Sequence, residues 1–399
     1  MNKQVNLGIV GGRRGAAFNK ALKILEDKVR LVAICDISKE VLSAWQRERP
    51  EIKIFDDFDE LLRKGDCDAV YLATPFKLHA KQAIKAMEAG VHVLSEVIAA
   101  TTLDECWKLV DSVKSTGMKY MLAENCCYLR SNMMILNMVE KGVFGELTYA
   151  EGAYIHDCRN LFFDDHGHLT WRGSLLREHS GNFYPTHSLG PVAQWLGVNK
   201  PNGDRLITTS SFMTKEAAMH RFVEKKFGAD HPGAKRSFYL HGDSTTTIIC
   251  TEKGVVIVLR MDPISPRPHN MTHYVLQGTS ASYISARHVN EDPLIWIEGK
   301  SPGTSPSLTL QQEAKWEPLW VYSDLYEHIR WKEKGDLARD FGHRGSDFFV
   351  IEDFIDSIIY DRQPPINVYD AVTWSSIMPL SIESMRKNGA PIEIPDFTK

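Results

Sequence analysis

The first 125 residues alternate short, uniformly apolar segments with segments of helical composition. The apolar segments are VNLGIVG, VRLVAICD, AVYLAT, VHVLSE and KYMLAEN, at residues 5–11, 29–36, 69–74, 91–96 and 119–125. Strands without a polar face are buried on both sides, which is typical of parallel sheets covered by helices on both faces. We therefore predict an α/β domain with an open parallel sheet over residues 1–125.

The pattern changes after residue 125, where strands become longer and apolar and polar residues alternate. LTYAEGAYIH at residues 147–156 is one such strand, and TTTIICTEKGVVIVLRM at residues 245–261 predicts a hairpin that turns near Lys253 and Gly254. We predict a second, α+β domain with a large, mostly antiparallel, open-faced sheet over residues 126–345. Residues 346–399 are expected to add C-terminal helices and a tail that pack back between the two domains.

Composition limits the classes of function. A chain of 399 residues accommodates two such domains. Its net charge of −4 gives no electrostatic reason to bind nucleic acid or an anionic membrane, and no apolar run reaches the roughly 18 residues of a membrane span. The seven cysteines lack the spacing of a disulfide framework, so we expect reduced thiols in a cytoplasmic protein.

The first apolar segment ends in a glycine-rich turn, GIVGGRRGA, at residues 8–16. Glycine lets the backbone approach a pyrophosphate, and a following helix directs its first N–H groups at it. Aligned with G-x-G-x-x-[GA], the turn places Gly11 first, Arg13 second and Ala16 third, so the middle glycine is missing. Asp36 ends the next strand, where an acidic residue binds the ribose hydroxyls of NAD. The structural alternative for Asp36 is a cap on the helix that follows.

These features predict a Rossmann domain that binds NAD, while an arginine of the turn that reached a 2′-phosphate would favour NADP. Cofactors of open α/β sheets bind at the carboxyl ends of the strands, where further polar residues stand in this sequence. For His79 the alternative is a first-turn helix residue, and for Glu96 it is the cap of a backbone amide. The candidate cofactor-binding residues are Gly11, Gly12, Arg13, Arg14, Gly15, Asp36, Thr74, Pro75, His79, Glu96 and Asn125.

A metal site is the competing interpretation of DDHGHLTW at residues 164–171. Asp165, His166 and His168 offer possible ligands, and His156 lies nearby in the sequence. No cysteine joins this group and no two of its histidines have helical i, i+4 spacing, so we predict no metal.

Two motifs resemble the Gfo/Idh/MocA oxidoreductase superfamily, which pairs a Rossmann domain with an open-faced α/β domain. They are ATPFKLH at residues 73–79 and GVHVLSE at residues 90–96. Most dehydrogenases of that superfamily continue with Glu-Lys-Pro, where this chain has EVI at residues 96–98. Their second-domain Asp, four residues before a His, is replaced by Phe183 before His187. The missing lysine argues against net alcohol dehydrogenation by the usual machinery.

The chain is similar to one subgroup in particular, glycoside hydrolase family 109, the NAD-dependent α-N-acetylgalactosaminidases. The similarity runs in order through nearly the whole chain, in the segments EVIAATTLDECWKLV (96–110), AENCCY (123–128), YIHDCR (154–159), GNFYPTHSLGPVAQ (181–194), SPRPHN (265–270), GHRGSD (342–347), VYDAVTWSSIMPLS (368–381) and PDFT (395–398).

The resemblance implies a glycosidase that recycles its NAD. Hydride passes from C3 of the sugar to NAD, the new ketone acidifies the C2 proton, a base removes it as the glycosidic oxygen leaves, and water adds before the hydride returns. By motif position the active-site residues are Tyr154, His156, Tyr184 and His187. His187 would serve the C3 hydroxyl and Tyr154 the C2 proton, while the other two position the sugar or assist the leaving group.

The resemblance also bears on the substrate. The candidate substrate-binding residues are Arg172, Asn182, Arg267 and His269, and family members carry Tyr at the position of His269. They often carry Pro in place of Ile98 and Gly in place of Ser188, Arg344 and Ser346. We therefore expect α-N-acetylgalactosaminides or a broader range of glycosides as the small carbohydrate substrate, and a dimer or tetramer as the assembly. The alternatives are a sugar or cyclitol dehydrogenase or epimerase, and a non-catalytic sugar- or NAD-binding protein.

Overall fold

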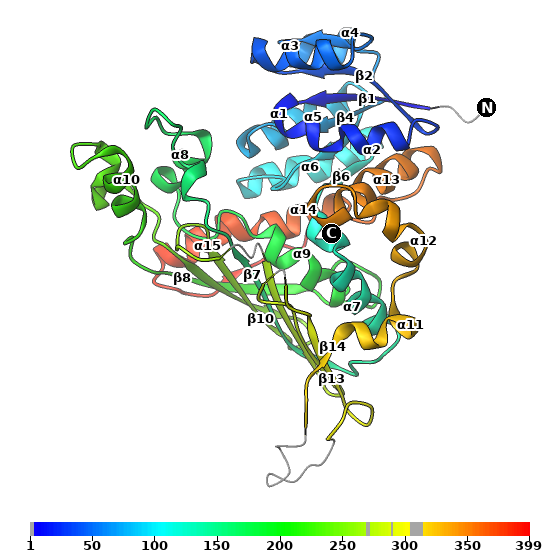
Figure 1. Cartoon of the computed structure of the whole chain (residues 1–399), viewed down its shortest axis with the longest axis vertical. Helices are drawn as coiled ribbons and strands as arrows, with labels where there is room; N and C mark the ends of the chain where they lie inside the picture. The colour runs from blue at the N-terminus through cyan, green and yellow to red at the C-terminus, as the bar shows by residue number, and fades with distance from the viewer. Residues whose placement is uncertain (1–3, 269–271, 289, 304–313) are drawn as a thin grey trace. The chain divides into compact units, whose positions relative to one another are not determined.

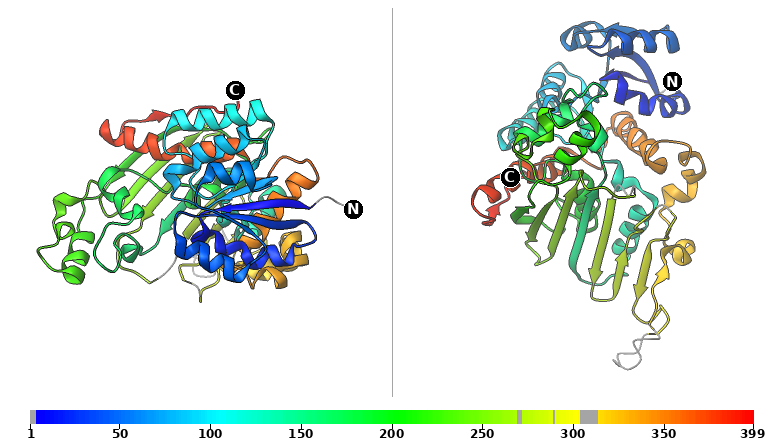
Figure 2. Two further views of the ribbon diagram at one scale, coloured as in Figure 1. Left: turned by 90° about the horizontal axis from the view of Figure 1, so that it is seen from above. Right: turned by 60° about the vertical axis from the view of Figure 1, so that its left-hand side comes forward.

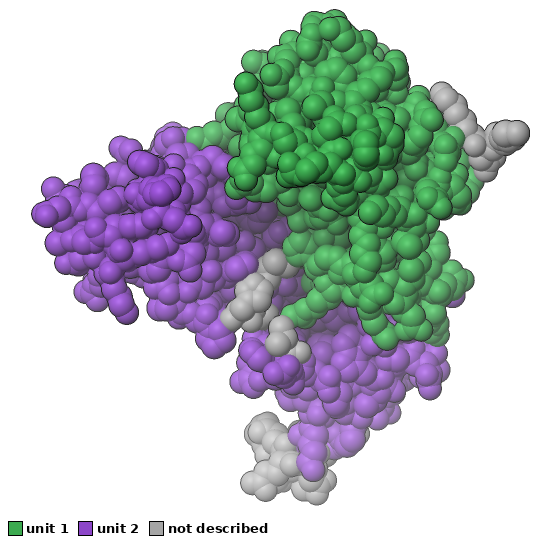
Figure 3. All heavy atoms as spheres, turned by 45° about the horizontal axis from the view of Figure 1, so that its top comes forward, with its two compact units in different colours: residues 1–129, 330–376, 396–399 green, residues 130–329, 377–395 purple. Residues whose placement is uncertain are grey.

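Two sheets organise the chain, one in each of two units coloured separately in Figure 3. The computed structural model describes residues 4–268, 272–288, 290–303 and 314–399. Unit 1 comprises Met1–Leu129, Arg330–Ser376 and Asp396–Lys399, and unit 2 comprises Arg130–Ile329 and Ile377–Pro395. The domain boundaries at residues 125 and 345 stay predictions from the sequence.

Unit 1 contains a six-stranded sheet with the order β3-β2-β1-β4-β5-β6, in which every neighbouring pair is parallel. Its core positions, such as Leu7, Ile9 and Ile34, are fully buried, which explains why these segments are apolar throughout. The predicted parallel sheet is confirmed. The strands are β1 (Val5–Val10), β2 (Val29–Cys35), β3 (Lys53–Phe55), β4 (Ala69–Leu72), β5 (His92–Ser95) and β6 (Tyr120–Leu122).

Helices from both ends of the chain complete unit 1 (Figure 1). Residues 12–24 form one helical stretch after β1, in three parts: α1 (Gly12–Gly15), the 3-10 turn η1 (Ala16–Phe18) and α2 (Asn19–Ile24). Of the late helices, α13 packs against β1, η1 and α2, and α14 packs against α6 and β6. The other helices and 3-10 turns are α3 (Lys39–Glu48), α4 (Phe58–Lys64), η2 (Phe76–Leu78), α5 (His79–Glu88), α6 (Leu103–Thr116), η3 (Asn125–Tyr128), α12 (Ile329–Ala338), η9 (His343–Gly345), α13 (Ser346–Ile359) and α14 (Val368–Ser375).

Unit 2 contains a nine-stranded sheet with the order β14-β13-β12-β11-β7-β10-β9-β8-β15 (Figure 2). Its described pairs are antiparallel except for β10 with β7, which is parallel. The predicted mostly antiparallel sheet and the hairpin of β9 with β10 are confirmed. The strands are β7 (Leu147–Ile155), β8 (Leu206–Met213), β9 (Thr245–Thr251), β10 (Val256–Asp262), β11 (Thr272–Gly278), β12 (Ala281–Ile284), β13 (Leu294–Ile297), β14 (Glu317–Pro318) and β15 (Ile392–Glu393).

Helices cover one face of this sheet. Helix α9 packs on β7, β10 and β11, and α15 packs on β8. Every second residue of β9 is exposed, among them Thr246, Ile248 and Cys250, so the opposite face is open. The helices of unit 2 are α7 (Arg130–Glu140), α8 (Trp171–Glu178), α9 (Thr186–Trp195), α10 (Met219–Phe227), α11 (Ser323–Tyr326) and α15 (Ile377–Arg386).

Among the described residues, no helix has the length and apolar character needed to cross a bilayer. All seven cysteines are free thiols, including the adjacent Cys126 and Cys127.

Candidate active site

The glycine turn of unit 1 sits where β1 meets α1. Gly11 has a left-handed φ of 96°, and a Cβ there would lie 2.5 Å from the carbonyl oxygen of Ala73. A Cβ on Gly15 would lie 2.2 Å from Cγ2 of Ile9, so Gly15 provides the close packing of helix on strand. Ala16, assigned that place in the predicted motif, is exposed. The motif register was therefore wrong at its third position, and the turn uses Gly11, Gly12 and Gly15.

Asp36 ties the end of β2 to this turn. Its Oδ2 accepts a hydrogen bond of 2.7 Å from the backbone N–H of Gly12, and its Oδ1 accepts one of 2.8 Å from the N–H of Ser38. Ser38, and not Asp36, caps α3, because the Ser38 side chain accepts from the N–H of Val41. Each carboxylate oxygen keeps a second lone pair. Asp36 can therefore accept ribose hydroxyls while it holds the turn, which fits NAD.

Arg14 and Glu96 form an ion pair at the same edge of the sheet. Arg14 Nε donates to Glu96 Oε1 over 2.7 Å, and the buried hydroxyl of Tyr71 donates to the same oxygen over 2.5 Å. Burial, and next the charge of Glu96, raise the pKa of Tyr71 well above its ordinary value, so Tyr71 stays a donor. Glu96 therefore holds the guanidinium of Arg14 at this edge of the sheet. Arg13 is exposed.

His79 joins the segments that follow β4 and β5. It is the first residue of α5 and is 1% exposed, with Nδ1 lying 2.8 Å from the carbonyl oxygen of Ile98 and Nε2 lying 2.8 Å from that of Thr74. Burial lowers the pKa of His79. Thr74 also donates from Oγ1 to Gln82, and Pro75 stands at the start of η2. His79 thus shapes the loop at the carboxyl end of β4, beyond its place in the first turn.

Asn125, a predicted cofactor-binding residue, belongs to a group of hydrogen-bonded polar side chains. The sequence did not indicate the other members of this group. Its Nδ2 donates to Oδ1 of Asp347 over 3.0 Å, and Nδ1 of His343 lies 2.9 Å from Oδ2 of Asp347. Burial raises the pKa of Asp347, but the hydrogen bond and charge of His343, together with Arg14 and Asn125, outweigh it and lower the pKa. Asp347, His343 and Tyr71 were missed as candidates, although GHRGSD had been noted as a segment.

The four predicted catalytic residues lie together in unit 2. The ring centroid of Tyr154, near the end of β7, lies 5.1 Å from that of Tyr184, 5.6 Å from that of His187 and 5.8 Å from that of His156. Tyr184 and His187 are 5.0 Å apart with their rings edge to face. Two phenols and two imidazoles from two chain segments thus form one cluster.

The approach of α9 to β7 creates this cluster. A Cβ on Gly152 of β7 would lie 2.0 Å from the carbonyl oxygen of Ser188, so only glycine lets the helix backbone rest on the strand. Tyr154 is two residues further along β7 and points to the same face. From β11, the hydroxyl of Tyr274 donates to the carbonyl oxygen of His187 over 2.5 Å.

The turn before α9 is fixed at its other end. The N–H of Asn182 donates to Oγ of Ser381 over 2.9 Å, and Nε2 of His241 lies 2.9 Å from the carbonyl oxygen of Gly181. His241 is 1% exposed and contacts the ring of Phe183 edge to face. Phe183, which stands where the superfamily has its Asp, therefore packs in the interior.

The electrostatic surroundings of Tyr154 favour its protonated form. Its hydroxyl lies 3.6 Å from Sγ of Cys158. Burial is the largest cause that raises the pKa of Tyr154 well above its ordinary value, and Cys158 and Tyr184 add to it, while the charge of Arg172 acts in the opposite direction. Tyr154 therefore carries its proton at neutral pH.

The predicted substrate-binding residues differ in their placement. Arg172, the second residue of α8, is exposed and close enough to Tyr154 to affect its ionisation. The side-chain amide of Asn182 and Nε of Arg267 are buried without a hydrogen-bond partner among the described residues. Buried polar groups normally have partners, so a bound molecule or water would complete both. His269 lies outside the described residues.

The metal candidates form a surface loop. The carboxylate of Asp164 accepts hydrogen bonds from the backbone N–H groups of His166 and His168 over 2.9 and 2.8 Å. The side chain of Asp165 is fully exposed. Asp164 thus closes the loop through backbone hydrogen bonds, and Asp165 faces solvent.

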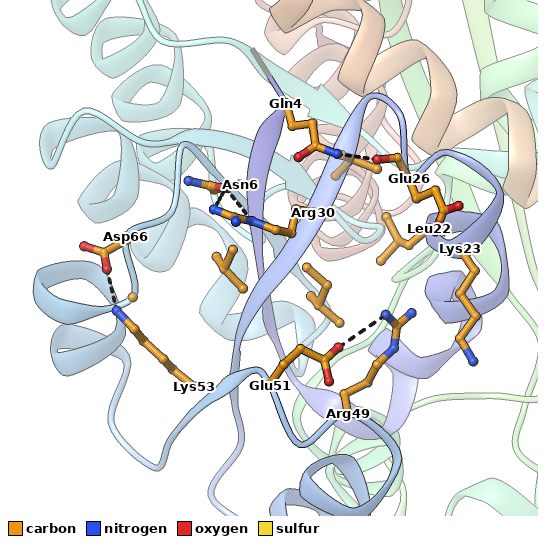
Figure 4. A pocket seen from close by; sticks show the side chains of 14 residues that line it. Gln4, Asn6, Leu22, Lys23, Glu26, Arg30, Arg49, Glu51, Lys53 and Asp66 are labelled. Atoms are coloured by element: carbon orange, nitrogen blue, oxygen red, sulfur yellow. Dashed lines mark hydrogen bonds and ion pairs between the residues drawn. The ribbon is translucent and has the colours of Figure 1, made fainter. Parts of the chain in front are cut away.

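A pocket of about 650 Å³ lies at the opposite edge of the unit 1 sheet from the glycine turn (Figure 4). It opens at the amino ends of the parallel strands and is lined by charged side chains that pair with one another. Arg49 pairs with Glu51 over 3.7 Å, and Lys53 pairs with Asp66. None of the predicted site residues lines it.

Known protein families match both the N-terminal and the C-terminal part of the chain. Residues 5–124 match the oxidoreductase family with an NAD-binding Rossmann fold, and residues 128–399 match the C-terminal domain of glycosyl hydrolase 109. A glycosyl hydrolase family 109 protein of Stenotrophomonas maltophilia is 37% identical over 99% of this chain and 89% of its own. An alpha-N-acetylgalactosaminidase of Tannerella forsythia is 34% identical over 98% of this chain and 85% of its own.

The fold also has solved counterparts. A levoglucosan dehydrogenase in complex with NADH and L-sorbose covers 99% of this chain and 100% of its own, with a TM-score of 0.78 and 19% identity. A likeness at this level of identity concerns the fold alone.

Proposed function

The chain belongs to glycosyl hydrolase family 109, and from that membership we propose that it cleaves α-N-acetylgalactosaminides or related glycosides with the residues clustered in unit 2. It is an NAD-dependent glycoside hydrolase built on an oxidoreductase-like fold. The cluster of Tyr154, His156, Tyr184 and His187 carries the proposal, because it brings four proton-carrying rings within 6 Å of a neighbour.

The residues of unit 1 fit the cofactor. Gly11 has no Cβ, so the turn can lie against the backbone of Ala73 that follows β4, and Asp36 offers carboxylate oxygens to the ribose hydroxyls. The further residues proposed to hold NAD are Gly12, Arg13, Arg14, Gly15, Thr74, Pro75, His79, Glu96 and Asn125. When bound, NAD supplies a hydride acceptor for C3 of the sugar and later returns the hydride.

In the proposed mechanism, His187 takes the proton of the C3 hydroxyl as that carbon is oxidised. Tyr154, as its phenolate, then takes the C2 proton; the electron pair forms the C1–C2 double bond and the bond from C1 to the glycosidic oxygen breaks. His156 gives a proton to the departing oxygen, and Tyr184 orients the sugar. Water adds at C1, and the same groups return the protons in reverse.

The raised pKa of Tyr154 suits this role. A proton next to a ketone is a weak acid, and the conjugate base of a phenol with a high pKa is a correspondingly strong base. The same high pKa makes the phenolate scarce at neutral pH. The charge of Arg172 lowers the pKa of Tyr154 and so increases the fraction of phenolate.

The first test is a panel of aryl glycosides, α and β, assayed with the NAD content of the purified protein. We expect cleavage without accumulation of NADH. Stoichiometric NADH without cleavage would instead indicate a sugar or cyclitol dehydrogenase. Tight NAD binding with no turnover on any glycoside would indicate a binding protein. His187→Ala should abolish turnover and leave NAD bound, and loss of NAD would mean that the site is misplaced.

Two observations bear on the substrate. His269 stands where the family motif has Tyr, and the side chains of Asn182 and Arg267 have buried polar atoms without a hydrogen-bond partner among the described residues. We propose that Arg172, Asn182, Arg267 and His269 contact the sugar or its aglycone. The glycoside panel decides whether the N-acetyl group is required.

We also propose a cytoplasmic location and a homodimer or homotetramer. The seven free cysteines suit a reducing compartment. The open sheet face exposes Ile248 and Val256 on neighbouring strands, and pairing of two such faces would bury them. Light scattering of the purified protein tests the assembly, and a monomer would contradict it.

A further inference from the structure

The loop that precedes α13 holds an arginine in an uncommon backbone conformation. His343, Arg344 and Gly345 have consecutive positive φ values of 50°, 59° and 97°. Glycine adopts this left-handed region freely, whereas a residue with a Cβ pays a steric cost. Gly345 meets the requirement by its residue type, whereas His343 and Arg344 do not.

This loop belongs to the edge of unit 1 that carries the glycine turn. Asp347 accepts a hydrogen bond of 3.0 Å from Asn125, which follows β6 at the carboxyl edge of the sheet. Asp347 also lies within electrostatic reach of Arg14 in the turn itself. Lys20, in α2, donates to the carbonyl oxygen of Asp340 over 3.2 Å. The loop and the turn are therefore neighbours within one unit.

Charged side chains next to this loop are paired, whereas Arg344 of the loop and Arg13 of the turn are exposed. Arg14 is paired with Glu96, and Asp347 is paired with His343. Arg344 is exposed, and in the part of the chain that the structure describes it has no ion-pair partner. The loop therefore presents an exposed cation without an ion-pair partner, from a strained backbone, near the glycine turn, where a bound anion can accept it.

We propose that Arg344 binds the pyrophosphate of NAD and that the left-handed loop directs its guanidinium to that group. Guanidinium binds phosphate oxygens with two parallel hydrogen bonds, which adds direction as well as charge. The glycine turn approaches the pyrophosphate from the backbone side, and Arg344 supplies the side-chain charge. The inference rests on NAD as cofactor and is independent of how the sugar is cleaved.

The test compares Arg344→Gly with Arg344→Lys in the full chain, by calorimetric titration of NAD, ADP-ribose and NADP. For Arg344→Gly we expect the Kd of NAD and of ADP-ribose to rise about tenfold, since one charge-assisted contact is lost. The Kd of NADP should rise by the same factor. Arg344→Lys should recover part of the affinity for NAD. Added salt screens charges, so it should reduce the difference in the Kd of NAD between wild type and Arg344→Gly.

Thermal unfolding without cofactor measures a second effect of the same substitution, on stability, and we expect this effect to be favourable. Arg344→Gly relieves the left-handed strain, so its Tm should rise by about 2 °C while its affinity falls. The matched controls are Asn388→Gly, at another exposed left-handed position (φ 56°), and Arg339→Gln, an exposed arginine of unit 1. Neither should change the Kd of NAD.

Three outcomes would overturn the proposal. Unchanged affinity for NAD and ADP-ribose in Arg344→Gly would make Arg344 a loop residue without a role in binding. A selective loss of NADP affinity would assign it to the 2′-phosphate. An equal loss in Arg339→Gln would reduce the effect to general charge.

Discussion

Replacing Gly152 by alanine tests how the catalytic cluster is assembled. The added Cβ would lie 2.0 Å from the carbonyl oxygen of Ser188, whereas non-bonded carbon and oxygen atoms stay at least about 3 Å apart. Helix α9 must therefore move away from β7 by about 1 Å. Tyr184 and His187 would move with the helix, while Tyr154 would stay on the strand.

Such a displacement has a calculable consequence. A misplacement of about 1 Å in a catalytic group costs on the order of 100-fold in rate, and overpacking of this kind costs roughly 1–3 kcal/mol of stability. We expect kcat on the best aryl glycoside to fall about 100-fold in Gly152→Ala. The Kd of NAD should be unchanged, because the glycine turn lies in unit 1. Steady-state kinetics and NAD titration measure both quantities.

The sheet offers a matched control. A Cβ on Gly278 would lie 2.1 Å from the carbonyl oxygen of Phe144, which is a similar clash at the other end of β7, where Gly278 pairs with Leu147. Gly278→Ala should lose comparable stability and keep most of its kcat. Full activity in Gly152→Ala, or an equal loss of kcat in both variants, would refute the idea that this backbone contact positions the site.

Three further predictions follow from the same contacts. Because burial and the neighbouring Cys158 and Tyr184 raise the pKa of Tyr154, and because a base must be ionised, log kcat/KM should rise with pH from neutral through pH 9; a fall over that range would contradict Tyr154 as the base. Tyr274→Phe removes the hydrogen bond to the carbonyl oxygen of His187 and should lower kcat roughly 3- to 10-fold, whereas Tyr283→Phe, whose ring also packs against Trp195, should not. Asp36→Ala should raise the Kd of NAD about tenfold and reduce discrimination against NADP, as measured by titration of both; an unchanged preference would mean that Asp36 only supports the turn.

Periodicity predicted the sheets well. Uniformly apolar runs such as Leu7–Ile9 follow directly from burial on both faces, and alternation along β9 follows from an open face. The register of the glycine motif was not predicted correctly, because the identity of the packing glycine depends on which residue meets Ile9. That contact depends on how α1 folds back onto β1, and the spacing of the glycines in the sequence leaves this undetermined.

Only part of the candidate site could be predicted from the sequence. Tyr154, Tyr184 and His187 lie in short sequence motifs, so the family resemblance could identify them. The groups that hold them are scattered: Tyr274 lies on another strand and His241 in a loop, each as a lone polar residue. Asp347 stands more than 200 residues from Asn125, its partner. Such contacts form only when distant segments meet, and a single sequence carries no local sign of them.

The central claim is that the glycosidic bond breaks by elimination after transient oxidation, and the isotope content of the product tests it most directly. Holoenzyme would cleave its best glycoside in D₂O, and NMR or mass spectrometry would locate deuterium in the released sugar. The account predicts deuterium at C2, because Tyr154 exchanges its proton with solvent between removal and return. A product without deuterium at C2, released at the normal rate, would contradict it.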